Sequence, residues 1–184
     1  EAFFRGFLPR LLPDGVTWQA VVFQGKADLL SQLEKRLKGY KAWMPTNWRI
    51  IVVVDEDRED CRRLKQRLEA AAHSADLPTK AAPRNGQFIV LNRIVVEELE
   101  AWFFGDPSAL ASEFEGVAPT LGQQEPYRDP DRIAGGTWES LERVLQKAGH
   151  YPSGISKIDV ARRMATRLNP AKNTSQSFRQ FVEG

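Results

Sequence analysis

Cysteine and histidine are scarce in this sequence, and their scarcity narrows the chemistry that the chain can carry. Cys61 is the single cysteine, which excludes an internal disulfide and any cysteine-based zinc site. A lone thiol fits a reducing compartment, so we expect a cytoplasmic protein. His73 and His150 are the two histidines, and they leave little room for a serine–histidine or histidine–metal mechanism. No apolar run approaches the roughly 20 residues of a membrane-spanning helix, so we expect no membrane partner.

The chain also lacks a strong excess of charge of either sign. Its 26 basic and 24 acidic residues leave a formal net charge of +2, too small for a global field that attracts nucleic acid. Any nucleic-acid surface must therefore be local. With 184 residues, the chain is long enough for one domain with a real core, or for one domain with a small extension.

One stretch, WRIIVVVDEDRED at residues 48–60, combines a buried strand pattern with a cluster of acids. Residues 50–54 are all β-branched and show no alternation, which predicts a central strand of a parallel sheet, buried on both faces. Asp55 and Asp57 follow at its carboxyl end, where open α/β sheets bind ligands. Two carboxylates there suit Mg²⁺ or Mn²⁺. The alternative is that Asp57 caps the next helix, but capping accounts for one acid and not for the cluster.

Strands and helices alternate through the first part of the chain. This order predicts an α/β fold with a mostly parallel sheet flanked by helices, as in Rossmann-like folds. The sequence begins inside an amphipathic helix and without methionine, so we expect a further strand upstream of residue 1. The expected helices are 1–12, 28–38, 59–73 and 95–104, and the expected strands are 16–23, 50–54 and 87–94.

The character of the chain changes after residue 106. Residues 105–136 are rich in glycine and proline and predict irregular structure around one short helix at 107–114. Helices are expected again at 137–148 and 156–168, before a last turn near Phe178. We therefore predict an α/β domain over residues 1–106 and a C-terminal helical extension over 107–184, packed on the same domain.

Glu98 is a second candidate metal ligand. It lies at a neighbouring junction between a strand and a helix, beside Glu97 and Glu100. Residues two apart on a helix diverge by about 200°, so Glu98 and Glu100 face one ion only if the junction is extended. The alternative is that these glutamates are ordinary charges at the start of a helix.

Lys157 is a candidate phosphate-binding residue, because it begins a helix behind Gly154 and Ser156, where backbone N–H groups and an ammonium meet an anion. We predict that the helical extension brings Lys157 within reach of a phosphate bound near Asp55. The alternative is that Ser156 caps the helix and Lys157 is simply exposed. Lys26, after Gly25, is a weaker case of the same kind, because the rest of a phosphate-binding loop is missing.

Three aromatic residues in a row, at 102–104, have two interpretations. Trp102 and its neighbours could stack on bases. Adjacent aromatic residues on a helix more often pack in the core, and we favour that interpretation. Trp43, Trp48 and the other tryptophans remain unassigned at this point.

Three blocks of the sequence carry a resemblance to a known family. VVVDEDREDCRRLKQRLE, then RIVVEELEAWFFGDPSAL, then SKIDVARRMA with NTSQSF resemble an uncharacterised bacterial family regarded as TOPRIM-like and commonly encoded in phage-defence operons. The acids after the first strand resemble the Asp-x-Asp motif of TOPRIM domains, the metal-binding module of topoisomerases, primases and nucleases that accompany defence ATPases. The resemblance implies a TOPRIM fold, metal-dependent phosphodiester hydrolysis and an ATPase partner.

The resemblance also has a departure. A TOPRIM domain carries a glutamate at the end of its first strand, and that strand would lie before Glu1. Glu1 itself falls in the first expected helix and does not match that glutamate. The resemblance implies that Asp55, Asp57 and the upstream glutamate hold one or two Mg²⁺ ions.

Three functions follow from these observations. The first is a Mg²⁺-dependent TOPRIM-type nuclease. Its expected substrate is nucleic acid, DNA before RNA, and it is expected to work with an ATPase partner and as a homo-oligomer. The second is a non-catalytic TOPRIM-like partner of an ATPase. The third is a phosphatase or phosphotransferase with Asp55 as nucleophile. Such enzymes carry a serine or threonine soon after the second aspartate, and this chain has Glu59 and Asp60 there instead, which counts against the third function.

Overall fold

The computed structural model describes residues 1–57 and 59–184, and the chain divides into two compact units. The α/β unit comprises Val22–Val96 with Gly184, and the helical unit comprises Glu1–Val21 and Glu97–Glu183. The first helix thus packs with the C-terminal helices, whereas the sequence analysis grouped it with the strands. Among the described residues, no helix is both long enough and apolar enough to cross a membrane.

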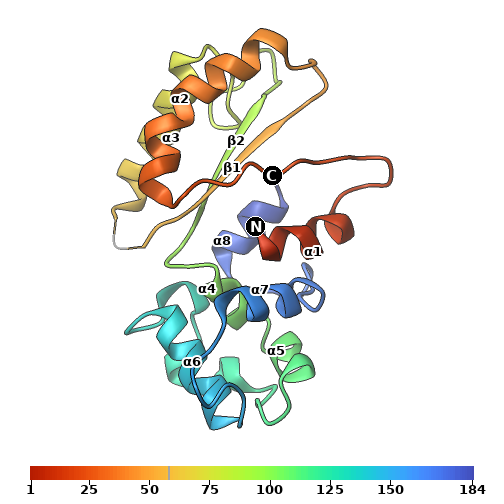
Figure 1. Ribbon diagram of the computed structural model, residues 1–184, viewed down its shortest axis with the longest axis vertical. Helices are drawn as coiled ribbons and strands as arrows, with labels where there is room; N and C mark the ends of the chain where they lie inside the picture. The colour runs from red at the N-terminus through yellow and green to blue at the C-terminus, as the bar shows by residue number, and fades with distance from the viewer. Residues whose placement is uncertain (58) are drawn as a thin grey trace. The chain divides into compact units, whose positions relative to one another are not determined.

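The α/β unit is built on a small parallel sheet (Figure 1). Strand β1 (Ile50–Asp55) pairs with strand β2 (Val90–Val95) in a register that aligns Ile50 with Val90 and Asp55 with Val95. Helix α2 (Lys26–Trp43) precedes β1, and helix α3 (Cys61–Ser74) connects β1 to β2. The expected α/β class, with a parallel sheet flanked by helices, is therefore confirmed in this coarse form.

Three expectations about the sheet are wrong. Within the described residues β1 pairs with β2 only, so it is not a central strand between parallel neighbours. Ile51 is 46% exposed, which shows that the unbroken β-branched run is not buried on both faces. Residues 16–23, all of them described, form no strand. β-branched composition favours extended backbone, but a strand also needs a neighbouring backbone to bond to, and that neighbour is not visible in local sequence.

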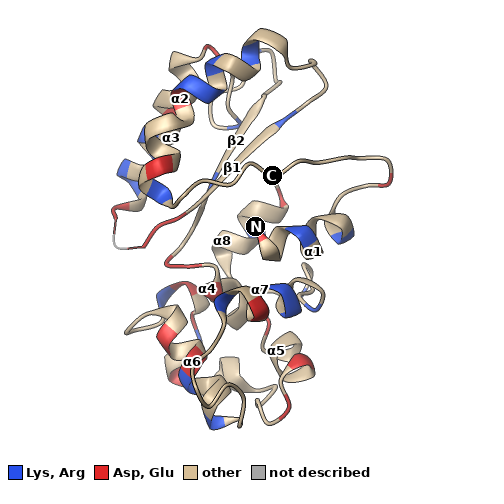
Figure 2. Ribbon diagram, in the orientation of Figure 1, with Lys and Arg blue, Asp and Glu red and all other residues tan. Residues whose placement is uncertain are grey.

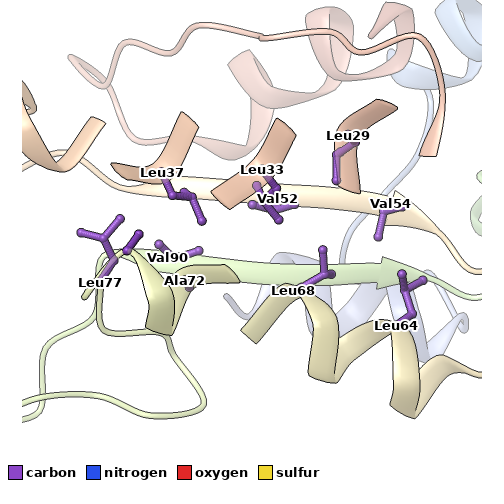
Figure 3. Packing of buried hydrophobic residues seen from close by; sticks show 11 residues of the cluster. Leu29, Leu33, Leu37, Val52, Val54, Leu64, Leu68, Ala72, Leu77 and Val90 are labelled. Carbon is purple, nitrogen blue, oxygen red and sulfur yellow. The ribbon is translucent and has the colours of Figure 1, made fainter. Parts of the chain in front are cut away.

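One hydrophobic cluster holds the α/β unit together. Val52 and Val54 point to the same face of the sheet because side chains alternate along a strand. Leucines from α2 and α3 pack on that face (Figure 3). Their spacing of four residues places them on one side of each helix. Each fully buried leucine contributes about 1.5–3 kcal/mol. The helical residues of this cluster are Leu29, Leu33 and Leu37 on α2, and Leu64, Leu68 and Ala72 on α3.

The helical unit contains the remaining elements. They are α1 (Ala2–Leu11), α4 (Glu100–Phe104), α5 (Pro107–Glu113), α6 (Thr137–Lys147), α7 (Lys157–Ala165) and α8 (Gln176–Val182), with three short 3-10 turns between α5 and α6. Helix α1 packs against α7. The irregular segment with a short helix at its start, and the two helices after it, agree with the sequence analysis.

Trp102 is the centre of the helical unit. Its ring lies 5.2 Å from that of Phe178 and 5.1 Å from that of Phe181, and it contacts Phe3 at 5.8 Å. The indole Nε1 donates a hydrogen bond of 2.9 Å to Ser177 Oγ, so the buried polar atom is satisfied. Trp102 is fully buried, which confirms the core interpretation and removes it from any base-stacking surface.

Candidate functional site

The acidic cluster forms a tight turn at the carboxyl end of β1. Glu56 N donates to Val95 O at 2.8 Å and extends the ladder by one residue. Asp57 then adopts a left-handed backbone with φ of 53°, which turns the chain. Asp60 Oδ1 accepts a hydrogen bond of 2.8 Å from Arg63 N and so caps α3. The cap is therefore Asp60, and the alternative that assigned capping to Asp57 is wrong.

Lys26 lies against this turn. It is the first residue of α2, after Gly25, whose φ of 89° suits glycine. Its ammonium lies 2.8 Å from Asp57 Oδ2 and 3.6 Å from Glu59 Oε2. It also donates to the carbonyl oxygens of Glu56 at 2.8 Å and Asp55 at 3.3 Å. Two carboxylates and two backbone carbonyls thus surround one cation. The acidic residues that follow β1 are coloured red in Figure 2.

The two carboxylates around Lys26 differ in their surroundings. Glu59 is 29% exposed, and its second oxygen accepts a hydrogen bond of 2.8 Å from Arg67 Nη1. Asp57 is 52% exposed and therefore open to an incoming ligand. Lys26 is 21% exposed, so its stem is largely covered while its ammonium faces the turn. Of these groups, Asp57 is the one that a soluble cation reaches most directly.

Asp55 and Asp57, the two predicted metal ligands, both lie at this turn. Asp55 ends β1 and is exposed. The left-handed backbone of Asp57 interrupts the extended geometry that would send both carboxylates in the same direction. Across residues 1–57 and 59–184, no three side chains of His, Cys, Asp or Glu gather as a metal-binding group. The oxygen donors at the turn are thus a mixture of carboxylates and backbone carbonyls.

The other two predicted residues, Glu98 and Lys157, bind each other in the helical unit. Lys157 Nζ lies 3.0 Å from Glu98 Oε1. The ammonium also lies 4.5 Å from the centre of the Trp138 ring, a cation–π contact. Because Asp55 and Asp57 belong to the α/β unit, the approach of Lys157 to a phosphate near Asp55 stays a prediction.

Glu98 also supports the start of helix α6. Its Oε2 accepts hydrogen bonds from Trp138 N at 3.2 Å and Thr137 Oγ1 at 3.4 Å. The N-cap residue of α6 is Gly136, which has no side chain to cap the helix itself. A distant carboxylate thus satisfies an N–H that the local sequence leaves open. On α7, Ser156 Oγ accepts from Asp159 N at 3.3 Å, which confirms the capping alternative for Ser156.

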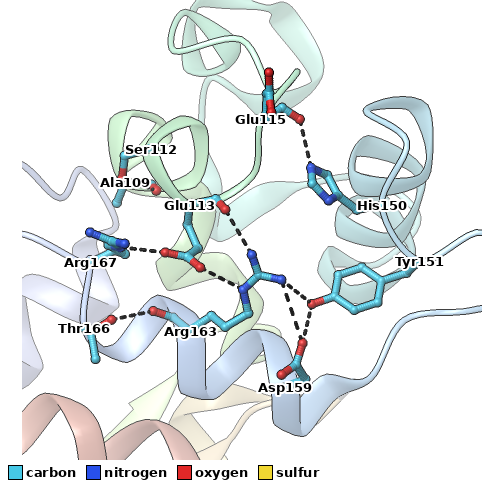
Figure 4. Close-up of polar contacts among 10 residues, drawn as sticks. All are labelled: Ala109, Ser112, Glu113, Glu115, His150, Tyr151, Asp159, Arg163, Thr166 and Arg167. Atoms are coloured by element: carbon cyan, nitrogen blue, oxygen red, sulfur yellow. Dashed lines mark hydrogen bonds and ion pairs between the residues drawn. The ribbon is translucent and has the colours of Figure 1, made fainter.

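A further polar cluster in the helical unit joins α5 to α7 (Figure 4). Glu113, 13% exposed, accepts from Arg163 Nε at 2.7 Å and from Arg167 Nε at 2.5 Å. Burial raises the pKa of Glu113, but the two arginines outweigh burial and hold that pKa below its ordinary value. Arg163 Nη1 donates to Tyr151 Oη at 3.1 Å, and that hydroxyl donates to Asp159. Both Glu113 oxygens are occupied, so we regard this cluster as structural.

Lys26 is the residue whose importance the sequence analysis underestimated. The position of Lys26 could have been predicted from the sequence, because a helix and a strand joined by a short loop run antiparallel. The start of α2 must then return to the end of β1, which brings residue 26 beside residues 55–57. The residues Gly25-Lys26 alone indicate only an incomplete phosphate-binding loop, and the end of the strand that Lys26 meets follows from the antiparallel packing of α2 on β1.

Comparison with known proteins gives a family but no activity. Residues 1–184 match the family model described as Domain of unknown function (DUF4276). The comparisons with curated proteins and with solved structures gave no match. The resemblance to TOPRIM domains accordingly stays a proposal.

Proposed function

The chain belongs to the DUF4276 family of domains of unknown function, and we propose that it is a Mg²⁺-dependent phosphodiesterase that acts on nucleic acid. The observation that carries this proposal is the set of four oxygens from residues 55–59 around the Lys26 ammonium. This turn already holds a cation with carboxylate and carbonyl oxygens, the ligand types that Mg²⁺ prefers. The TOPRIM resemblance supports the same chemistry and adds an ATPase partner in phage defence.

Each residue of the turn has a role in this proposal. Asp55 and Asp57 would hold Mg²⁺ or Mn²⁺. A bound divalent ion would neutralise charge on a phosphate and lower the pKa of a water molecule. Lys26, released from Asp57, would donate to a phosphate oxygen. Glu59 stays with Arg67, at 2.8 Å, and keeps the turn in place. Glu98 is already engaged by Lys157 and by the start of α6, so we assign it a structural role.

A non-catalytic role is the second candidate, and one observation favours it. The Lys26 ammonium neutralises the acids without any metal, because it lies within 4 Å of both Asp57 and Glu59. Such a turn could serve only to fix the end of β1 to the start of α2. The chain would then act through contacts with a partner protein rather than through hydrolysis.

Cleavage assays on matched variants separate the two candidates. Labelled single-stranded and duplex DNA would be incubated with wild type, Asp55→Asn, Asp57→Asn and Asp14→Asn, in Mg²⁺, Mn²⁺ or EDTA. Asp14→Asn is the control, since it removes an exposed aspartate in the turn after α1. We expect metal-dependent cleavage that falls at least about 100-fold in the Asp55 and Asp57 variants only. Absence of cleavage by wild type would favour the non-catalytic role.

A further inference from the structure

Two tryptophans are exposed at the start of β1, the end opposite the acidic turn. Trp43, the last residue of α2, is 60% exposed, and Trp48, just before β1, is 46% exposed. Their rings lie 5.9 Å apart at an angle of 79°, and Tyr40 continues the row at 5.8 Å from Trp43. Tryptophan is usually highly buried, so two adjacent exposed indoles point to a binding surface.

Backbone contacts hold this surface in place. Trp48 N donates to Pro45 O at 3.1 Å, which closes the turn between α2 and β1. Arg49 Nη1 donates to Trp48 O at 2.8 Å and to Thr46 O at 3.1 Å. The guanidinium thus fixes the loop that carries Trp48. A surface ordered before binding loses little conformational entropy when a ligand arrives.

Basic residues lie on the chain segments that carry Trp48 and Phe88. Arg49 and Lys80 each lie 6.0 Å from the centre of the Phe88 ring. Segments 40–49 and 80–89 carry Lys41, Arg49, Lys80 and Arg84 and no acidic residue. Asp76, outside both segments, pairs with Lys41 and Arg84. We call Trp43, Trp48, Phe88, Arg49 and Lys80 the tryptophan patch, and its chemistry suits an anionic partner with flat rings.

We propose that the tryptophan patch binds single-stranded nucleic acid, with bases stacked on Trp43 and Trp48 and a phosphate beside Arg49. Aromatic rings and a cation on one surface are the usual means of binding single strands without sequence preference. Duplex DNA fits poorly, because its bases are already stacked on each other. An anionic membrane fits poorly as well, since α2 turns its leucines into the core and keeps no apolar face for a bilayer.

The inference rests on the proposed function, because it supplies the polymer on which that function would act. The patch and the acidic turn belong to the same unit, at opposite ends of the six-residue strand β1. Five steps along a strand cover about 17 Å, so one bound strand could reach both places. A strand held on the patch would bring its phosphates toward Lys26 and Asp57.

Binding measured without metal tests the patch separately from cleavage. Fluorescence anisotropy of labelled oligothymidylate and oligouridylate, in EDTA, would follow wild type, Trp43→Ala, Trp48→Leu, Trp48→Phe and Ile158→Ala. We expect Trp43→Ala and Trp48→Leu each to weaken binding roughly tenfold, and Trp48→Phe to keep most of it, because a phenyl ring still stacks. Ile158→Ala is the matched control, because Ile158 is 62% exposed and lies in the helical unit, and this variant should bind the oligonucleotides as wild type does.

A salt titration tests the cationic part of the patch. Arg49→Gln should lower the slope of log affinity against log salt by about 0.7, the value for one phosphate contact on a single strand. Melting curves would confirm that every variant remains folded. A slope that Arg49→Gln leaves unchanged would remove Arg49 from the proposed contact.

Each remaining outcome decides for or against the patch. Binding of neither oligonucleotide, equal binding by the tryptophan variants, or binding to phosphatidylcholine–phosphatidylserine vesicles in place of oligonucleotides would overturn the inference. Oligonucleotide binding that needs the tryptophans, without cleavage in Mg²⁺, would keep the patch and refute the proposed function. Cleavage in Mg²⁺ together with binding that does not depend on the tryptophans would refute the patch and keep the proposed function.

Discussion

Replacing Lys26 by methionine removes the cation from the acidic turn and keeps most of the volume of the side chain. The wild-type ammonium has four oxygen neighbours, the nearest being Asp57 Oδ2 and Glu56 O, both at 2.8 Å. In the variant, Asp57 and Glu59 lose their common counter-ion and repel each other. Without Mg²⁺ the protein should therefore be less stable, and the turn should bind a soluble cation more tightly.

The distances and exposures give the size of both effects. Two unit charges 4 Å apart attract by about 1 kcal/mol in water and about 4 kcal/mol at an effective dielectric constant near 20. Asp57 is 52% exposed, so the lower value applies to its pair with Lys26. Removing a competing ammonium worth about 1 kcal/mol should tighten Mg²⁺ binding about fivefold. The lost hydrogen bonds to Glu56 O and Asp55 O bring the fall in the free energy of unfolding to about 2 kcal/mol.

Isothermal titration with Mg²⁺ and denaturant unfolding with and without Mg²⁺ measure these two quantities. Lys38→Met is the control, because Lys38 lies on the same helix and pairs with Glu34 in an exposed pair, 54% and 50% exposed. Lys38→Met should leave Mg²⁺ affinity unchanged and change stability by less than about 0.5 kcal/mol. If Lys26→Met binds Mg²⁺ no more tightly than wild type does, Lys26 does not compete with a divalent ion at this turn.

Two further predictions concern the helical unit. Glu113→Gln should lower the free energy of unfolding by about 1–3 kcal/mol at neutral pH, because it leaves Arg163 and Arg167 without their carboxylate. The pKa of Glu113 lies below its ordinary value of 4.5, so this contribution is complete above that pH and is lost as the pH falls through the folded pKa. Urea unfolding at several pH values measures this contribution. If Glu113→Gln and wild type still differed in free energy of unfolding in strong acid, the prediction would be contradicted. Glu98→Ala should lower the free energy of unfolding by about 1 kcal/mol, because the start of α6 loses a hydrogen-bond acceptor. The variant should keep the wild-type response of melting temperature to Mg²⁺. Loss of that response would show that Glu98 is a metal ligand.

Local sequence predicted those parts of the fold that depend on local interactions. The β-branched run at 50–54 and the leucines spaced by four on α2 and α3 identify their elements, because strand and helix each repeat with a fixed period. The same run could not reveal how many strands lie beside β1. That number depends on residues far away in the sequence, and the expected strand at 16–23 does not form.

The candidate site was predictable only in part, for a similar reason. Asp55 and Asp57 were found because they follow a recognisable strand. The contact between Lys26 and Asp57 joins residues 31 positions apart, and the contact between Lys157 and Glu98 joins residues 59 apart. Individual residue types suggest charge and capping, but only the packing of helices selects which charges meet. The assignment of the helix cap to Asp57 instead of Asp60 is a smaller error, since both residues are aspartates and aspartate is a competent N-cap.

The melting temperature as a function of Mg²⁺ concentration shows whether the turn after β1 is a divalent-cation site. A ligand at about 100 times its dissociation constant stabilises the folded state by about 2.7 kcal/mol, and for a chain of this size that should raise the melting temperature by roughly 5–10 °C. We expect wild type to show this rise, and Asp55→Asn and Asp57→Asn to lose it while they melt near the wild-type temperature without metal. A wild-type protein whose melting temperature does not respond to Mg²⁺ or Mn²⁺, or variants that respond as wild type does, would contradict the claim.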